Sequence, residues 1–407
     1  MSATASPGFD LRDPAFLADP YPVFERLRAM APVWKAPFGR WLLTRYDGCN
    51  LLLRDRRFGK DYTDPEALKR RFGPTALEEP AVVELSHMML MRDPPDHTRL
   101  RGLVSKAFTA RRIEALRPRV REMAERLIDA VMPAGRMDAI RDLAFPLPVM
   151  VICELLGIPN ADRDRFVKGS VSGGRLVDPT PPTRTELDAS NANVLATGAY
   201  FEALFEQRRR APADDLITQL VQAEEAGDRL TTAELRANVN LLFAAGHETT
   251  VNLIGNGLLS LLRRPDQWHM LREDTSLIPN AIEEILRFES PVQAVSRVVA
   301  EAVDIGGVTI ERGELVVAVL GAGNRDPAVF DNAHRLDVTR KNPNPLSFGG
   351  GIHFCLGAQL ARIEAAEVFG TVLRRLPGLR LAEPDRPQWR SRFALRGLTE
   401  LPVVWDT

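Results

Sequence analysis

Apolar residues recur at intervals of three and four along six stretches of the chain, with charged residues between them. This spacing places the apolar side chains on one face of a helix, so each stretch is predicted to be helical. The six stretches are Pro20–Met30, Ala110–Val131, Ala199–Arg210, Thr232–Leu262, Pro279–Phe288 and Gly357–Leu376. The pattern therefore predicts a mainly α protein.

Strand patterns are short and occur in two places, Trp34–Thr44 and Val303–Val319. In the second, Gly306-Gly307 separates two runs rich in β-branched residues, as expected for the turn of a β-hairpin. Small sheets are thus expected beside the helices.

Glycine, proline, serine and threonine are frequent between Lys168 and Ser190. This composition predicts a mobile loop, and helical patterns resume on both sides of it, so we interpret it as a loop within one domain. Either a lid over a pocket or an ordinary surface loop fits. No repeat or shift in composition divides the 407 residues, and we predict a single domain over residues 1–407.

The composition is that of an ordinary globular protein, with a net charge of −1 that gives no reason to expect nucleic-acid or membrane-surface binding. The three cysteines, Cys49, Cys153 and Cys355, lie far apart and lack the spacing of zinc or iron–sulfur ligands. A disulfide framework is not expected, and a cytoplasmic location fits. The first ten residues lack the basic and apolar segments of a secretory signal.

The stretch Thr232–Leu262 is the longest predicted helix. Thr231 and Glu234 form a capping-box pattern at its start, and 31 residues would span about 45 Å. His247 and Glu248 interrupt its apolar run, and charged groups are costly in a membrane. We therefore predict a buried helix that crosses the molecule, and no membrane anchor.

The richest motif is the segment Phe348–Gly357, FGGGIHFCLG, directly before a helical pattern. At a helix start, the helix dipole and free backbone N–H groups are expected to lower the pKa of the Cys355 thiol. The three glycines before it let the backbone approach a flat ligand where a Cβ atom would clash. Cys355 by itself also fits a structural cysteine beside a glycine turn.

This loop resembles the haem-binding motif of the cytochrome P450 family, Phe-x-x-Gly-x-His-x-Cys-x-Gly. The resemblance implies that haem b binds through the thiolate of Cys355, which pushes electron density onto the iron and favours O–O cleavage. The other loop positions that it implies in cofactor binding are Phe348, Gly349, His353 and Gly357.

In the middle of the long helix, a glycine, an acid and a hydroxyl lie together in apolar surroundings. A mid-helix glycine costs about 1 kcal/mol relative to alanine, and Thr249 is expected to hydrogen-bond back to the carbonyl of Ala245. A kinked core helix would explain this segment alone. However, Ala245, Gly246, Glu248 and Thr249 also match the family's oxygen-binding helix. That match implies cofactor contact by Ala245, and proton delivery to dioxygen by Glu248 and Thr249 as catalytic residues.

Two further sets of residues follow from the resemblance. Glu284 and Arg287, three apart on a helix, match the family's structural ion pair, whose third partner stays open between Asn324–Pro327 and Arg335. Haem propionates need cationic or donor partners, and the family's propionate ligands match His97, Arg101, Arg297 and His353.

The chain carries no flavin or iron–sulfur motif, so electrons are expected from a separate ferredoxin and ferredoxin reductase. The segment His97–Arg126 has nine Lys and Arg residues against three Glu. Its excess of positive charge, with Arg111 and Arg112 among the candidates, predicts attraction of an acidic ferredoxin. A solvated basic helix is the alternative interpretation.

The resemblance extends from Asp19-Pro20-Tyr21-Pro22 to the helix after Cys355. It implies one helix-rich domain with small sheets and with haem between the long helix and the cysteine-loop helix. The implied reaction inserts one oxygen atom of dioxygen into a C–H or C=C bond and reduces the other to water. A haem sensor or electron carrier and a peroxygenase are the alternatives, and the acid–alcohol pair Glu248 and Thr249 argues against both.

The substrate pocket is expected from family position to be mostly apolar, which favours a hydrophobic small molecule. Terpenoid, steroid, aromatic and macrolide substrates all stay open. The expected lining residues are Leu85, Met89, Leu90, Phe243, Ala244, Val292, Val295, Phe393 and Ala394.

Overall fold

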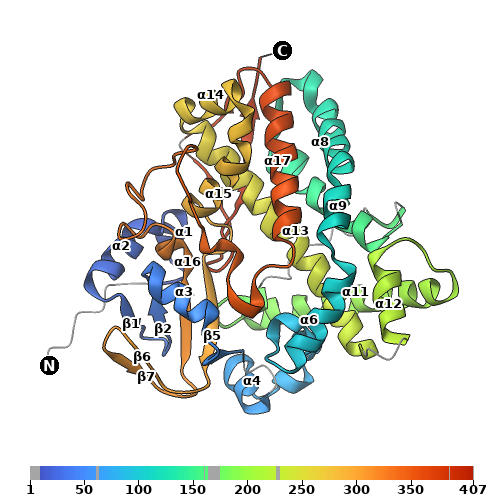
Figure 1. Cartoon of the computed structure of the whole chain (residues 1–407), viewed down its shortest axis with the longest axis vertical. Coiled ribbons are helices and arrows are strands. Elements are labelled where there is room, and N and C mark those ends of the chain that lie inside the picture. Colours follow the sequence, from blue (N-terminus) through green and yellow to red (C-terminus); the bar gives the residue numbers. More distant parts are fainter. Residues whose placement is uncertain are drawn as a thin grey trace.

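The structure, a computed structural model, describes residues 10–60, 64–159, 161–163, 175–225, 230–384 and 386–406. Helices form most of it, and the largest sheet and the predicted hairpin lie in the part that contains residues 21–54 (Figure 1). The α-helices of the described residues are α1 (Pro14–Ala18), α2 (Tyr21–Met30), α3 (Tyr46–Arg54), α4 (Pro65–Phe72), α5 (Pro80–His87), α6 (Asp96–Ala107), α7 (Ala110–Ala115), α8 (Arg117–Val131), α9 (Pro146–Leu156), α11 (Arg184–Arg210), α12 (Leu216–Glu225), α13 (Thr232–Leu262), α14 (Pro265–Glu273), α15 (Ile278–Phe288), α16 (Leu320–Gly323) and α17 (Ala358–Arg375).

The largest sheet has the strand order β1-β2-β8-β5-β3. Its strands are β1 (Val33–Lys35), β2 (Trp41–Leu43), β8 (Leu315–Val319), β5 (Ala294–Val299) and β3 (Phe58–Gly59). The predicted hairpin is confirmed, because β6 (Val303–Ile305) pairs antiparallel with β7 (Val308–Ile310) across Gly306 and Gly307, both of which have positive φ. Two smaller sheets pair β4 (Arg136–Asp138) and β9 (Arg380–Leu381) with β12 (Pro402–Val404), and β10 (Gln388–Trp389) with β11 (Leu398–Glu400).

The prediction of one helix over Ala110–Val131 was wrong, because the chain breaks into α7 and α8 at Leu116. Pro118 explains the break: it lacks an N–H group, and its ring would clash with the carbonyl of the residue four positions earlier in a continuous helix.

The predicted loop between Lys168 and Ser190 is shorter than expected. Thr183 and Glu186 form a capping box that starts α11 at Arg184, so residues 184–190 are helical. Residues 168–174 lie outside the described part of the chain.

Helix α13 occupies the centre of the helical part and has the predicted bounds. Both hydrogen bonds of the predicted capping box between Thr231 and Glu234 are present. The helix packs against α9, α11, α15 and α17, and most of its side chains are buried (Figure 1). Within the described residues, no helix combines the length and apolar character needed to cross a membrane.

A buried ion-pair network holds the segment before the cysteine loop. On α15, Glu284 and Arg287 pair through two contacts of 2.7 Å and are fully buried. The third partner is the Arg340 side chain, whose Nε lies 3.0 Å from Glu284 Oε2. Sequence reasoning left this partner open and did not consider Arg340. Asn324 and Arg335, which it did consider, instead supply backbone carbonyls to Arg287.

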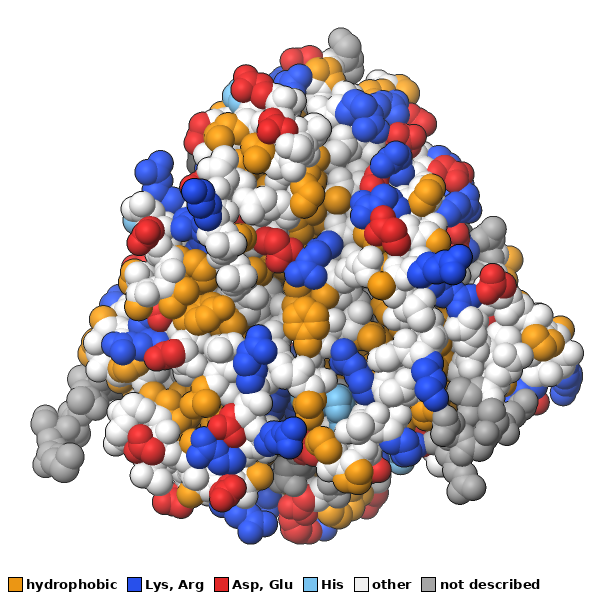
Figure 2. Space-filling model, in the orientation of Figure 1, with side chains coloured by type: hydrophobic (Ala, Val, Ile, Leu, Met, Phe, Trp, Pro, Cys, Tyr) orange, Lys and Arg blue, Asp and Glu red, His pale blue; other side chains and the backbone are white. Residues whose placement is uncertain are grey.

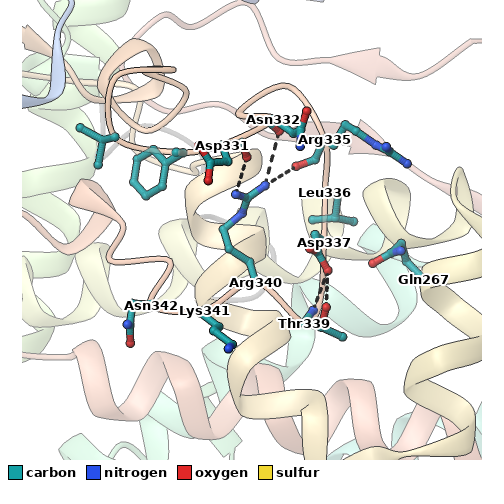
Figure 3. Close-up of a pocket in the computed structure, with 12 residues that line it drawn as sticks. Gln267, Asp331, Asn332, Arg335, Leu336, Asp337, Thr339, Arg340, Lys341 and Asn342 are labelled. Carbon is teal, nitrogen blue, oxygen red and sulfur yellow. Dashed lines mark hydrogen bonds between the residues drawn. The ribbon is translucent and has the colours of Figure 1, made fainter.

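Arg340 forms one wall of a polar surface pocket of about 580 Å³ (Figure 3). Its guanidinium also donates to the carbonyls of Asp331, Asn332 and Arg335. The connection between α16 and the cysteine loop is therefore tied to α15 by side-chain contacts, although it has little regular structure.

This network continues to the cysteine loop through Asn324. The Asn324 Oδ1 atom accepts the N–H of Leu346 at 2.7 Å, and its Nδ2 donates to Ser347 at 3.0 Å. Ser347 in turn donates to the carbonyl of Leu286 on α15. The backbone directly before Phe348 is thus fixed to the helix that carries the ion pair.

We expect Glu284→Gln to destabilise the protein by about 3–5 kcal/mol, because it removes the negative charge that offsets two buried guanidinium groups. The matched control is Glu283→Gln, since Glu283 pairs with Arg362 in a partly exposed position and should cost less than about 1 kcal/mol. Urea unfolding midpoints measure both effects. Equal midpoints for the two variants would contradict the structural role of the pair.

Candidate functional site

The cysteine loop is packed on one side and open on the other. Gly351 has φ of 60°, and a Cβ atom there would lie 2.6 Å from the backbone oxygen of Leu53 on α3. A Cβ atom on Gly357 would instead meet no atom within 4 Å. Cys355 lies between them, and its N–H donates to the carbonyl of Phe348 at 2.9 Å. The loop therefore needs glycine at 351 for its own packing and leaves space beside Gly357 for a flat ligand.

The expected low pKa of the Cys355 thiol is wrong for the chain without a bound metal. Burial raises this pKa above its ordinary value, and it outweighs the lowering effects of the Gly357 N–H and of Arg101 and Arg362. The helix start alone does not produce a thiolate at neutral pH. A metal ion at the sulfur is needed to hold the deprotonated form.

The middle of α13 has an open surface although the helix is otherwise buried. Ala245 is exposed and Thr249 is half-buried, whereas His247 and Thr250 are buried. The predicted hydrogen bond is confirmed, because Thr249 Oγ1 donates to the carbonyl of Ala245 at 2.9 Å. An exposed alanine at the centre of a buried helix is consistent with a ligand that covers it.

Glu248 makes contacts that sequence reasoning missed. Its Oε1 lies 2.7 Å from Nη1 of Arg392 and 3.6 Å from Nη1 of Arg390, in the segment between β10 and β11. The cost of burying this carboxylate is thus offset by ion pairs. The partner is 144 residues away in sequence, so no local spacing could have identified it.

Basic side chains from α6, β5 and the cysteine loop meet near Cys355. The rings of His97 and His353 lie 4.3 Å apart between centroids, and Arg101 Nη2 donates to the carbonyl of Phe354 at 2.7 Å. The Nε2 atoms of both histidines are buried and have no hydrogen-bond partner. Burial and the neighbouring cations Lys60, Arg297, His97 and Arg101 hold the pKa of His353 far below its usual range.

The cluster contains a cation that the sequence-based prediction omitted, Lys60. This residue directly follows β3, the strand that pairs with β5, and β5 carries Arg297. The register of that pair is the feature that identifies Lys60, and it is not visible in the sequence.

These features fit a haem. Like charges packed together repel one another, and in the described part of the chain the buried Nε2 atoms of His97 and His353 have no hydrogen-bond partner, so the cluster favours a buried anion. The two propionates of haem are such anions. Beside them, the thiol of Cys355, the open side of Gly357 and the exposed Ala245 fit a flat metal-containing ring.

The expected substrate residues lie in four different apolar clusters. Leu85 packs with α4 and α5, Met89 and Phe243 belong to the main helical core, Val292 and Val295 border the large sheet, and Phe393 packs on Phe16 with ring centroids 5.9 Å apart. Phe243 also lies between Phe201 and His247. Ala244 is half-buried on α13, Leu90 packs against two clusters and Ala394 is buried. Their role in a pocket stays a prediction.

The basic segment His97–Arg126 is less cationic in the fold than in the sequence. Carboxylates from other parts of the chain pair with five of its arginines, as in Arg112 with Asp214 and Arg121 with Glu367. Arg111 is exposed, and no ion pair of it occurs among the described residues. Figure 2 shows Lys and Arg side chains spread around hydrophobic ones on the face where α17 lies. Ile352 and Phe354 of the cysteine loop are among the exposed hydrophobic residues of the chain.

Comparisons with known proteins identify the family of the chain. The family model described as cytochrome P450 matches residues 188–379. Cytochrome P450 107B1 of Saccharopolyspora erythraea is 45% identical over 398 residues, which are 96% of each chain. Vitamin D(3) 25-hydroxylase of Pseudonocardia autotrophica is 44% identical over 410 residues, 99% of this chain and 98% of the relative.

A solved structure of a similar protein has the same fold. P450BioI, in complex with an acyl carrier protein ligated to hexadec-9Z-enoic acid, is 40% identical and superposes with a TM-score of 0.90. The match covers 97% of this chain and 100% of that one. The similarity therefore extends over almost the whole chain and is not limited to the cysteine loop.

Proposed function

The chain belongs to the cytochrome P450 family, and from this premise we propose how its own residues serve the reaction. It is a haem b monooxygenase that oxidises small hydrophobic molecules. The observation that carries the assignment of residues is the contact of the Cys355 loop with a buried basic cluster, in which the rings of His97 and His353 lie 4.3 Å apart between centroids and Arg101 donates to the carbonyl of Phe354.

Cys355 is proposed as the axial ligand of the haem iron. Phe348, Gly349 and Gly357 would lie against the ring, and His97, Arg101, Arg297 and His353 would bind the propionates. Haem bound through a thiolate supplies the electron density that favours cleavage of the O–O bond of dioxygen. The protein must hold the ring at a fixed distance from α13, and the hydrogen bonds from Asn324 to Leu346 and Ser347 support this position.

Glu248 and Thr249 are proposed to deliver protons. The Thr249 hydroxyl lies on the half-buried side of α13 and donates to the carbonyl of Ala245, and its rotation would point its proton toward the site, with Glu248 replacing the proton that is given up. The ion pair with Arg392 holds the Glu248 side chain in place beside Thr249, where its carboxyl group would relay protons from solvent.

We propose that the substrate is a hydrophobic or amphipathic molecule, which the protein oxidises at a C–H or C=C bond. The expected pocket residues are apolar, and relatives are named for vitamin D(3) hydroxylation or were solved with a C16 fatty acid on a carrier protein. Apolar side chains hold such molecules by removing their surface from water.

Electrons are proposed to come from an acidic ferredoxin with its reductase. The docking surface would combine exposed Ile352 and Phe354 at its centre with the exposed cation Arg111 at its edge. An apolar centre with a charged rim is the usual anatomy of a specific interface. The α7 helix lies close to the start of α17, because Gln359 donates to Glu114.

We also propose that residues 1–407 act as one domain in the cytoplasm. Arg396, near the C-terminus, donates to the carbonyls of Leu17 and Ala18 in α1, so the two ends of the chain are joined. The buried thiols of Cys49 and Cys153 are not oxidised to disulfides, which agrees with a reducing compartment.

The carbon monoxide difference spectrum of the reduced protein tests the haem ligand. The wild-type chain should give a strongly red-shifted Soret band, because thiolate ligation alters the electronic structure of the haem. Cys355→Ala should abolish that band. A wild-type spectrum like that of histidine-ligated haem, or purification without haem, would refute the proposed function.

Thr249→Ala should lower the fraction of consumed oxygen that appears as product several-fold, because the hydroxyl that moves a proton is lost. Thr249→Ser keeps the hydroxyl and serves as the matched control. Product yield per NADH oxidised, measured with a substrate found by screening, gives this fraction. Full coupling in the alanine variant would rule out the assigned role.

Arg111→Glu should slow reduction by an acidic ferredoxin several-fold at low ionic strength, because a like charge replaces an attractive one in the docking surface. The difference should shrink as salt is added. Arg312→Glu, an exposed residue in the turn between β7 and β8, is the control. Stopped-flow reduction rates that are the same for both variants would exclude this docking surface.

A further inference from the structure

Lys60 lies in the sheet opposite Arg297. In the antiparallel pair of β3 and β5, Phe58 is opposite Val299 and Gly59 is opposite Val298. Continuing this register by one residue places Lys60 opposite Arg297. Directly opposite residues in an antiparallel pair have their side chains on the same face, with Cβ atoms about 5 Å apart. The Lys60 and Arg297 side chains thus leave the sheet together, toward the basic cluster.

The Lys60 side chain is buried without a partner for its charge. The residue is 9% exposed, and within the described residues no hydrogen bond or ion pair involves its ammonium group. The carboxylate of Asp93 interacts electrostatically with Lys60, but its Oδ2 accepts the backbone N–H of Lys60 at 2.8 Å. A Cβ atom on Gly59 would lie only 2.8 Å from the same oxygen, so the glycine allows Asp93 to hold the backbone in place.

The groups that face Lys60 are mainly cationic. Arg297, Arg71, His97 and His353 all interact electrostatically with it, and Asp93 is the opposing charge. Burial, with Arg297 and Arg71, lowers the pKa of Lys60 well below its ordinary value when nothing else is bound. Like charges directly opposite each other destabilise a sheet, so an anion bound beside Lys60 would stabilise this arrangement.

We propose that Lys60 is a fifth residue of the propionate site and that its ammonium group binds the same carboxylate as Arg297. This inference rests on the proposed haem site and extends it to a residue outside the cysteine loop, α6 and β5. The flat ring enters between α13 and the cysteine loop, and its carboxylate reaches the end of β3. Lys60 then gains the partner that the protein alone does not supply.

The test compares three variants of the holoenzyme. Lys60→Met keeps the length and apolar stem of the side chain but removes the charge, whereas Lys60→Arg keeps the charge. Lys341→Met, which removes the charge of an exposed lysine of the surface pocket, controls for net charge. The rate of haem transfer from each ferric protein to excess apomyoglobin is measured, together with the midpoint potential of the haem iron.

Lys60→Met should lose haem about tenfold faster than the wild type, as expected when one buried charge-assisted hydrogen bond is lost. Its midpoint potential should move to more negative values, because a nearby cation that stabilises the added electron is absent. Lys60→Arg and Lys341→Met should stay close to the wild type in both measurements. A purely structural role for Lys60 would not shift the potential in this direction.

Equal haem-transfer rates for Lys60→Met and the wild type would overturn the proposal, and so would an unchanged potential. Failure of Lys60→Arg to restore the wild-type values would also overturn it, since packing and not charge would then be the cause. These outcomes differ from failure of the proposed function, because wild-type protein without thiolate-ligated haem would show that failure before any variant is made.

Discussion

The buried ion-pair network around Glu284 fixes the part of the molecule on which the site depends. Two guanidinium groups and one carboxylate are removed from water there, and such a set is tolerated only when every partner is in place. Arg287 and Arg340 use their remaining N–H groups on backbone carbonyls of the irregular segment before the cysteine loop. The network therefore fixes the position of a segment that has no regular secondary structure. Through Asn324 it determines where Phe348, and hence Cys355, lies.

In the basic cluster, by contrast, positively charged side chains outnumber the carboxylates that the described residues place beside them. His97 and His353 have unpaired buried nitrogens, and Lys60 lies beside Arg297. Packing of the surrounding core holds these groups close together, and the anionic cofactor would supply the negative charge that they need. The same holds for Cys355, whose thiol is kept protonated by burial until a metal ion binds. Cofactor binding is thus coupled to the stability of this region.

Helix α13 connects the proposed proton delivery with the expected substrate contact. Its packing in the core fixes the position of Ala245 and Thr249, which are proposed to lie at the haem, while Glu248 on the same turn contacts the arginines between β10 and β11. Those arginines are followed directly by Phe393 and Ala394, which are expected near the substrate. Proton delivery and substrate contact therefore depend on one loop and one helix that hold each other by an ion pair.

The sequence by itself determined the features whose causes are local in the chain. The capping box at Thr231 and the apolar spacing gave α13 its bounds, and the hairpin at Gly306-Gly307 followed from two glycines between β-branched runs. The ten residues Phe348–Gly357 predicted haem through their resemblance to the family motif, which lies within one short segment. Tertiary structure decided which distant groups meet: Arg340 with Glu284, Arg392 with Glu248, and Lys60 with Arg297. It also decided the pKa of Cys355, because burial depends on the packing of the whole chain and not on the residues next to the thiol.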